Sequence, residues 1–331
     1  MEIDFCHISR LFVFWNARDS ILLYYFWKIP VFNCLIYKSN KTLKKKIIFV
    51  VNPISGDIDK TEYIEATKLF AEVENLEFIV FETSGDDDIA KIKSLYNIHK
   101  PERIIVAGGD GTIKIVAEAI EKYDVILGIL PAGSANGLSA DLNLPNSLEE
   151  NLKIAFHNSY MEMDMISING KKSLHLSDLG LNADLVKNYE NGDIRGKLGY
   201  ALQTFTTLTE MEEPFFATIL ANNQIIECQA RMIVIANSQK YGTGVMINPN
   251  GLMNDGKFEL VILKNLDLIT FGKIITGNMP INSEDIEIIS TDKAIIKTKS
   301  PVSFQIDGEY CGPETELNIR ILHKQMKVAI P

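Results

Sequence analysis

Several features that would assign the chain to a secreted or membrane-spanning class are missing. Its four cysteines are scattered among 331 residues without a C-x-x-C pair or a metal-ligand spacing. This argues against a disulfide framework and a zinc site, and predicts a reducing, cytoplasmic setting. No uninterrupted apolar run reaches the about 20 residues of a spanning helix. There is no signal-peptide layout, internal repeat or low-complexity tract.

Positive charge is also in deficit. The chain has 33 Lys and Arg against 43 Asp and Glu, which gives a formal net charge of -10. Because such a surface repels the phosphate backbone, we expect no nucleic-acid partner. With 46% hydrophobic and 23% charged residues, the composition is that of a globular protein, and its length predicts two domains rather than one.

Residues 1–45 differ from the rest of the chain. They are rich in aromatic residues and contain both tryptophans, Trp15 and Trp27, and they end in a basic run that includes Lys44 and Lys45. Three interpretations stay open: a loosely ordered extension, an arm packed on the body, or an anchor at an anionic membrane surface.

The strongest local pattern is a strand, a glycine loop and a helix. Residues 104–107 form an apolar run typical of a strand buried on both faces, and Gly108, Gly109, Asp110 and Gly111 follow it directly. Thr112 then opens an amphipathic helix. A glycine loop at a helix N-terminus favours a phosphate, although a tight turn in a βα unit would have the same pattern.

Other predicted strands end in similar polar loops. Apolar runs at 47–51, 78–81 and 125–130 are each followed by small or hydrogen-bonding residues. The residues in question are Asn52, Pro53, Ser55, Gly56, Thr83, Gly133, Ser134 and Asn136. Alternation of strand and helix predicts a parallel α/β sheet, and the loops then gather at its carboxyl edge, where ligands bind in such folds.

The pattern changes near Tyr160 to short, turn-bounded strands that predict an antiparallel β-sandwich, interrupted by helices at 197–210 and 266–276. We therefore expect an N-terminal extension (1–45), an α/β nucleotide-binding domain (46–159) and a β-rich domain (160–322). A terminal segment (323–331) would pack back on the first domain.

Five segments in this order resemble the ATP-dependent lipid kinases that include bacterial diacylglycerol kinase-like enzymes and sphingosine kinases. They are Asn52-Pro53-x-Ser55-Gly56, Gly108 to Thr112, Gly133-Ser134-Ala135-Asn136, Asn254-Asp255-Gly256-Lys257 and Asp307-Gly308-Glu309. The resemblance implies ATP bound between the domains, Mg²⁺ on its phosphates, and a lipid hydroxyl as nucleophile. The glycine-loop and polar-loop residues, with Glu309, would contact the nucleotide.

The resemblance offers two carboxylates as catalytic base. We favour Asp307, with Asp110 orienting Mg²⁺ or the phosphates, since phosphoryl transfer needs a carboxylate near the attacking hydroxyl. By itself, Asp307-Gly308 would instead indicate a hairpin turn.

Further roles follow only from the resemblance. Arg195 would bind a nucleotide phosphate and Asp184 an amino-alcohol head group, although each could equally be a surface charge. Asp255, with carbonyls of Leu252 and Lys257, would hold a structural Mg²⁺. The acyl chains would occupy an apolar pocket of the sandwich domain, or the same residues would be plain core: Phe205, Leu208, Met211, Phe215 and Phe216.

Two departures bear on this interpretation. Many bacterial relatives have Asn-Glu where this chain has Lys114-Ile115, which would remove polar groups from the nucleotide side. The Gly133-Ser134-x-Asn136 form is closer to sphingosine kinases. We expect a lipid kinase with peripheral membrane contact, with homodimerisation left open. An NAD kinase and a non-catalytic lipid- or nucleotide-binding protein are the alternatives.

Overall fold

The structure is a computed structural model that describes residues 12–16, 20–24, 35–36, 44–134, 136–180, 183, 213–240, 246–265 and 284–331. The chain divides into two units, Met1–Lys44 and Lys45–Pro331. In the first unit, β1 (Phe12–Asn16), β2 (Ser20–Tyr24) and β3 (Leu35–Ile36) form an antiparallel sheet in the order β1-β2-β3. The interpretations of residues 1–45 stay predictions.

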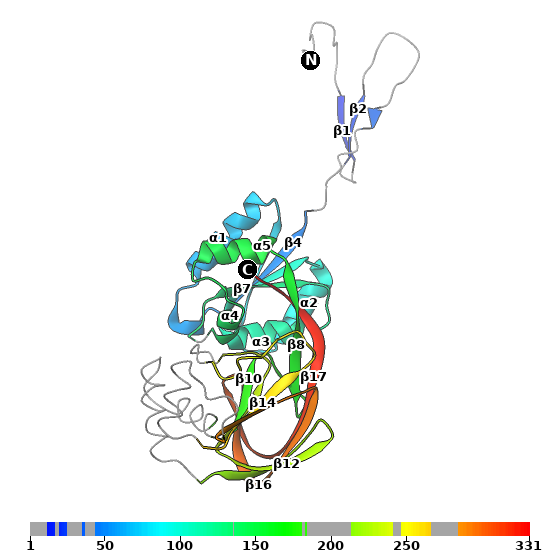
Figure 1. Ribbon diagram of the computed structural model, residues 1–331. Helices are drawn as coiled ribbons and strands as arrows, with labels where there is room; N and C mark the ends of the chain where they lie inside the picture. The colour runs from blue at the N-terminus through cyan, green and yellow to red at the C-terminus, as the bar shows by residue number, and fades with distance from the viewer. Residues whose placement is uncertain are drawn as a thin grey trace. The chain divides into compact units, whose positions relative to one another are not determined.

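The second unit begins with a parallel sheet in the order β7-β6-β4-β5. Figure 1 labels two of these strands, β4 and β7. Its strands are β4 (Lys46–Val51), β5 (Glu77–Glu82), β6 (Arg103–Gly108) and β7 (Ile126–Pro131). The middle strands are buried on both faces, since Ile48, Phe49, Ile104 and Ile105 are all fully buried. Such strands need a helical layer on each side.

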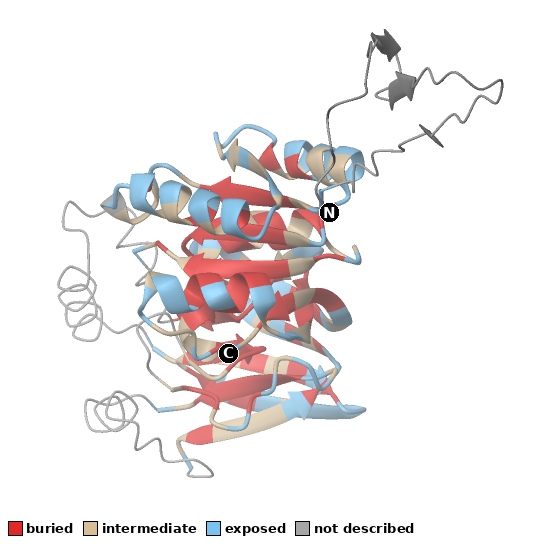
Figure 2. Ribbon diagram, turned by 90° about the horizontal axis from the view of Figure 1, so that it is seen from above, coloured by how far each residue is buried: buried red, intermediate tan, exposed pale blue. Residues whose placement is uncertain are grey.

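Helices supply both layers. They are α1 (Thr61–Val73), α2 (Asp88–His99), α3 (Asp110–Ala119), α4 (Gly137–Asp141) and α5 (Leu148–His157), with a short 3₁₀ turn η1 (Ser55–Asp57). Residues of α2 and α3 share one apolar cluster with the sheet, and residues of α1 and α5 share another. Figure 2 shows the buried strands between helices whose outer faces are exposed.

The remainder is mainly antiparallel β structure. Its strands are β8 (Tyr160–Ile168), β9 (Lys171–Ser173), β10 (Leu176–Gly180), β11 (Phe215–Ala221), β12 (Gln224–Ala230), β13 (Met232–Ala236), β14 (Phe258–Leu263), β15 (Ile286–Thr291), β16 (Lys293–Ile306) and β17 (Glu309–Ala329). They enclose a separate apolar cluster that includes Leu179, Ile233 and Phe304. The predicted fold class, a parallel α/β domain followed by an antiparallel sandwich, is confirmed.

Strand β17 belongs to both parts. It pairs with β16 from Glu309 to Arg320, and farther on Lys327 and Val328 pair in parallel with β7. It also pairs with β8, with a register shift between Leu322 and Met326. One strand therefore links the sandwich to the edge of the α/β sheet.

The predicted helices at 197–210 and 266–276 lie outside the described residues. Strand β16 runs without a break from Lys293 to Ile306, although its register with β17 shifts between Lys297 and Val302. Among the strands of the sandwich, the sequence reasoning missed β9, β12, β15 and β17.

Candidate functional site

Three of the predicted loops lie together at the carboxyl edge of the parallel sheet. The backbone N–H of Asn52 donates to the carbonyl of Ala107 (3.3 Å), and that of Ala132 donates to the carbonyl of Gly108 (3.0 Å). The Asn52 side-chain amide also donates to Thr112 Oγ1 (3.3 Å). The loops after β4, β6 and β7 thus contact one another through main chain and side chain.

Gly56 fixes how closely two of these loops approach. It adopts φ +67°, and a Cβ atom there would lie 2.8 Å from the Gly133 carbonyl carbon and 2.9 Å from the Ser134 nitrogen. A larger residue would need both a left-handed backbone and a displaced neighbouring loop. The loop after β4 and the loop after β7 are therefore closely packed against each other.

Lys60, which the sequence reasoning did not single out, ties the same two loops together. Its ammonium donates to the carbonyls of Ser55 (2.6 Å) and Ala132 (2.8 Å), and the residue is only 4% exposed. Ser55 Oγ donates to the same Ala132 carbonyl (3.1 Å). Lys60 thus stabilises the predicted nucleotide loops. Nothing in the sequence around this lysine indicated such a role.

Asp110 and Asn136 hold the loop that follows β7. Gly133 N–H donates to Asn136 Oδ1, and Asn136 Nδ2 donates back to the Gly133 carbonyl, both at 3.0 Å. The Asp110 carboxylate accepts the N–H groups of Gly137 (2.8 Å) and Leu138 (3.1 Å) at the start of α4. Burial raises the pKa of Asp110, and the nearby Asp307 carboxylate adds to this shift.

The turn between β16 and β17 carries the other candidate carboxylate. Asp307 (φ +50°) and Gly308 (φ +88°) are the two central residues of the hairpin, as a primed turn requires. The Asp307 carboxylate accepts Ser173 Oγ–H (2.8 Å) and the N–H groups of Leu174 (2.9 Å) and His175 (3.0 Å). Its side chain is 4% exposed, so its position is firmly defined.

This turn meets the glycine loop of the α/β part. A Cβ atom at Gly111 would lie 3.8 Å from Glu309 Oε1. The Lys114 ammonium lies 3.8 Å from Asp307 Oδ2 and 3.5 Å from Glu309 Oε2. Lys114-Ile115 was expected to remove polar groups from this region; instead, Lys114 brings a positive charge between two predicted site carboxylates.

His175 is a buried residue of this region that the sequence reasoning gave no role. Its Nδ1 lies 3.1 Å from Ser238 Oγ and 3.4 Å from Asp141 Oδ2. Burial alone would lower the pKa of His175, but Asp141, Asp110 and Asp307 outweigh it and raise that pKa. His175 therefore lies among three carboxylates that favour its protonated form. These residues come from separate elements, so no local sequence pattern predicts the contact.

This arrangement predicts a pH-dependent stability. The pKa of His175 is higher in the folded state than in the unfolded state, where it is about 6.5. Its contribution to stability is therefore complete below pH about 6.5 and is lost as the pH rises through the pKa of the folded state. Urea unfolding of the wild type should give a lower free energy of unfolding at pH 9 than at pH 6. The difference between the two pH values should be smaller in His175→Asn. The control is His157→Asn, whose half-exposed imidazole pairs with Glu74. An equal drop in all three proteins would contradict the assignment.

The Asn254-Asp255-Gly256-Lys257 segment forms a turn that docks on Asp164 of β8. The fully buried Asp164 carboxylate accepts the N–H groups of Gly256 (2.7 Å) and Lys324 (2.6 Å), and contacts His323 Nδ1 (2.8 Å). Asp255 accepts the N–H of Lys257 (3.0 Å). Within the described residues, no group of three His, Cys, Asp or Glu could hold a metal ion.

The remaining predicted residues are distributed as follows. Pro53 and Ser134 are exposed, and Thr83 follows β5 with its N–H on the carbonyl of Val51 (2.9 Å). Phe215 packs against the sandwich core. Asp184 and Arg195 lie outside the described residues, as do Phe205, Leu208 and Met211.

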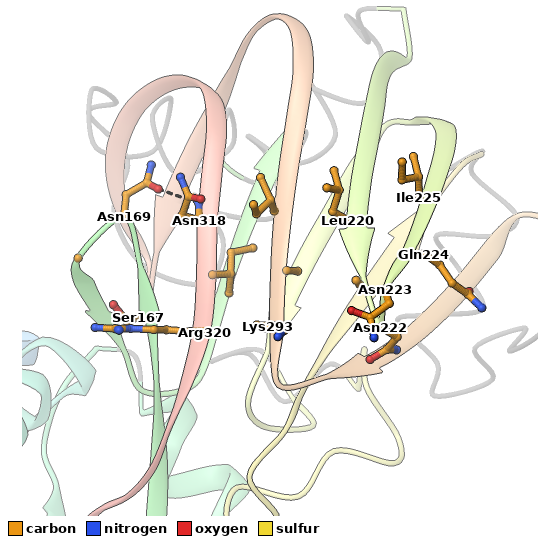
Figure 3. A pocket seen from close by; sticks show the side chains of 15 residues that line it. Ser167, Asn169, Leu220, Asn222, Asn223, Gln224, Ile225, Lys293, Asn318 and Arg320 are labelled. Carbon is orange, nitrogen blue, oxygen red and sulfur yellow. Dashed lines mark hydrogen bonds between the residues drawn. The ribbon is translucent and has the colours of Figure 1, made fainter.

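A cavity of about 740 Å³ lies elsewhere, among the hairpins of the sandwich (Figure 3). Lys293 and Arg320, which are cross-strand partners, line it together with Asn222, Asn223 and Leu220. None of the predicted nucleotide or catalytic residues lines this cavity.

Comparisons with known proteins agree with the order of the two parts. Residues 46–168 match the diacylglycerol kinase catalytic domain, and residues 178–330 match the YegS C-terminal NAD kinase beta sandwich-like domain. A candidate lipid kinase of Staphylococcus carnosus is 27% identical over 67% of this chain and 75% of its own length. A candidate lipid kinase YegS of Salmonella arizonae is 27% identical over 70% of this chain and 78% of its own length.

Solved structures agree with the fold. A diacylglycerol kinase from Bacillus anthracis superposes with a TM-score of 0.69 at 19% identity, covering 88% of this chain and 98% of its own. A second structure, of a candidate diacylglycerol kinase from the same organism, superposes with a TM-score of 0.70 at 22% sequence identity. The match covers 88% of this chain and 99% of the other.

Fold and matched domains define a two-domain kinase class, with a catalytic α/β domain and a β-sandwich domain. The chain belongs to the diacylglycerol kinase-like lipid kinase superfamily, among relatives named YegS. In the part of the chain that the structure describes, no helix is both long and apolar enough to cross a bilayer.

Proposed function

We propose that the protein transfers the γ-phosphoryl group of ATP to a lipid hydroxyl of the diacylglycerol or sphingoid-base type, between the α/β and sandwich domains. The contact of the Asp307-Gly308-Glu309 turn with the glycine loop is the observation that carries this proposal. It brings a buried carboxylate near a helix N-terminus that suits phosphate. These are the positioning and charge-stabilising groups that phosphoryl transfer requires.

The start of α3 fits a polyphosphate. Its N-cap residue is Gly109, which has no side chain that could cap the first N–H groups of the helix. Within the described residues, no hydrogen-bond acceptor is found for the N–H groups of Gly111 and Thr112. Free N–H groups and the positive end of a helix dipole favour phosphate oxygens. Asn52, Ser55, Gly56, Thr83 and Ser134 would complete the nucleotide contacts from the neighbouring loops.

Mg²⁺ would neutralise charge on the phosphates. Few carboxylates are needed, because Mg²⁺ is commonly bound by one or two of them together with substrate phosphates and water. Asp110 is the nearest candidate on the nucleotide side, and its two N–H contacts keep its carboxylate at the glycine loop. The second, structural Mg²⁺ at Asp255, Leu252 and Lys257 stays a proposal of its own.

Asp307 is the proposed base. Three protein donors orient its carboxylate, so that Oδ2 retains accepting capacity on the side of Lys114. There it could accept the proton of the attacking hydroxyl. Asp184 and Arg195 remain proposed head-group and phosphate contacts, and peripheral membrane contact would give access to the lipid.

One assay separates the candidate functions. The purified protein, with Mg²⁺ and ATP labelled at the γ-phosphate, is offered diacylglycerol, a sphingoid base, ceramide and NAD in parallel. We expect label in a lipid product, which mass spectrometry would identify. NAD kinase is the second candidate because the sandwich domain is of the NAD kinase-like type. Label in NAD alone would overturn the lipid kinase proposal, and no transfer would favour a binding protein.

A further inference from the structure

Lys114 forms an ion pair that is largely shielded from solvent. It lies in the first turns of α3, three residues after Gly111, and its side chain is 13% exposed. Its ammonium faces Asp307 Oδ2 at 3.8 Å and Glu309 Oε2 at 3.5 Å. Both carboxylates come from the hairpin turn of the other domain. The only lysine of α3 is thus directed at the residues that would meet the transferring group.

The charge around this ammonium is unbalanced. Glu118, one turn later on α3, also interacts with Lys114; burial raises its pKa, and the charges of Asp307 and Glu309 raise it further. Three carboxylates therefore interact with the Lys114 ammonium, and the Lys172 ammonium interacts with one of them, Glu118. An incoming γ-phosphate would add more negative charge at the same place, and repulsion would oppose it unless a cation stays there.

The two partners of Lys114 differ in a way that permits exchange. Asp307 is nearly buried and held by three donors, whereas the side chain of Glu309 is 64% exposed. An exposed glutamate can return to water at little cost, since surface ion pairs contribute little to stability. The ammonium can therefore leave Glu309 for a phosphate oxygen while it remains beside Asp307.

We propose that Lys114 is a phosphate-binding residue of this kinase, which exchanges its contact with Glu309 for the γ-phosphate of ATP. This inference rests on the proposed function. In the transfer, the bond from the γ-phosphorus to the β–γ bridging oxygen breaks, and that oxygen leaves on ADP with the electron pair. A bond from the lipid hydroxyl oxygen to phosphorus forms, and the hydroxyl proton passes to Asp307. Lys114 exchanges no proton and stabilises the charge on the transferring group.

Equilibrium binding tests this without turnover. Calorimetry would compare a non-hydrolysable ATP analogue with ADP, in Mg²⁺, for the wild type, Lys114→Met and Lys114→Arg. For Lys114→Met we expect analogue affinity to fall about tenfold to a hundredfold, as for a lost charged hydrogen bond, with ADP affinity changed little. Lys114→Arg should keep most of the preference for the analogue, since guanidinium also binds phosphate.

The matched control is Lys172→Met, which removes another partly buried lysine, paired with Glu121 at 2.9 Å. It should leave the preference for the triphosphate unchanged. Equal losses for analogue and ADP in Lys114→Met, or an unchanged preference, would overturn the inference and leave Lys114 as an interdomain ion pair. Loss of triphosphate preference in a protein that phosphorylates no lipid would support the inference while the proposed function fails.

Discussion

Asp307→Asn is expected to reduce phosphoryl transfer by about 10²- to 10⁴-fold, the usual contribution of a general base. The amide has the size of the carboxylate but cannot accept the hydroxyl proton. Nucleotide affinity should persist, because the proposed nucleotide contacts lie mainly on the α/β loops. Initial rates with labelled ATP, together with calorimetric nucleotide binding, give both quantities.

A matched control is Asp292→Asn, an exposed aspartate just before β16, at the far end of that strand from Asp307. It should retain full activity. Substantial turnover in Asp307→Asn would remove Asp307 as base. Asp110, whose pKa is raised by burial, would then be the remaining candidate.

Asp164→Ala should cause the largest loss of stability, about 3–5 kcal/mol. The substitution removes a fully buried acceptor from two backbone N–H groups, those of Gly256 and Lys324, and from the imidazole of His323. Donors left without a partner in the interior cost more than the same groups in water. Urea unfolding followed by circular dichroism would measure the change in free energy.

The comparison is Asp255→Ala, which removes an exposed carboxylate of the turn that docks on Asp164. With a chelator present, we expect the free energy of unfolding to change by less than about 1 kcal/mol, as for most surface substitutions. If the proposed structural Mg²⁺ binds there, added Mg²⁺ should raise the melting temperature of the wild type but not of Asp255→Ala. A loss as large as that of Asp164→Ala in the chelator would contradict this division of roles.

The α/β domain was predictable because its signals are local. Strands buried on both faces read as continuous apolar runs, and each predicted run lies within a residue or two of an observed strand, as 104–107 lies within β6. Glycine and short polar residues after these runs marked the loops correctly. Parallel pairing then brings the loops together without further information.

The missed features depend on contacts between distant residues. β17 alternates charged and apolar residues through a glycine and a proline, so that no window of its sequence has the pattern of a long strand. His175 acquires its role from Asp141 and Asp307, and Lys114 from a hairpin nearly 200 residues later. The departure at Lys114 was visible in the sequence, but the partners that explain it were not.

The course of β17 has a consequence for biosynthesis. Lys327 and Val328 pair with Ile126 and Leu127, so the edge of the α/β sheet is completed only by residues that follow the whole sandwich domain in the chain. During translation, β7 would have no partner on that side until residues near the C-terminus leave the ribosome. Contacts of such sequence separation form slowly, and an open strand edge invites intermolecular pairing. We therefore expect the nascent α/β domain to expose this strand edge, and to be prone to intermolecular pairing, until residues 327 and 328 have been synthesised.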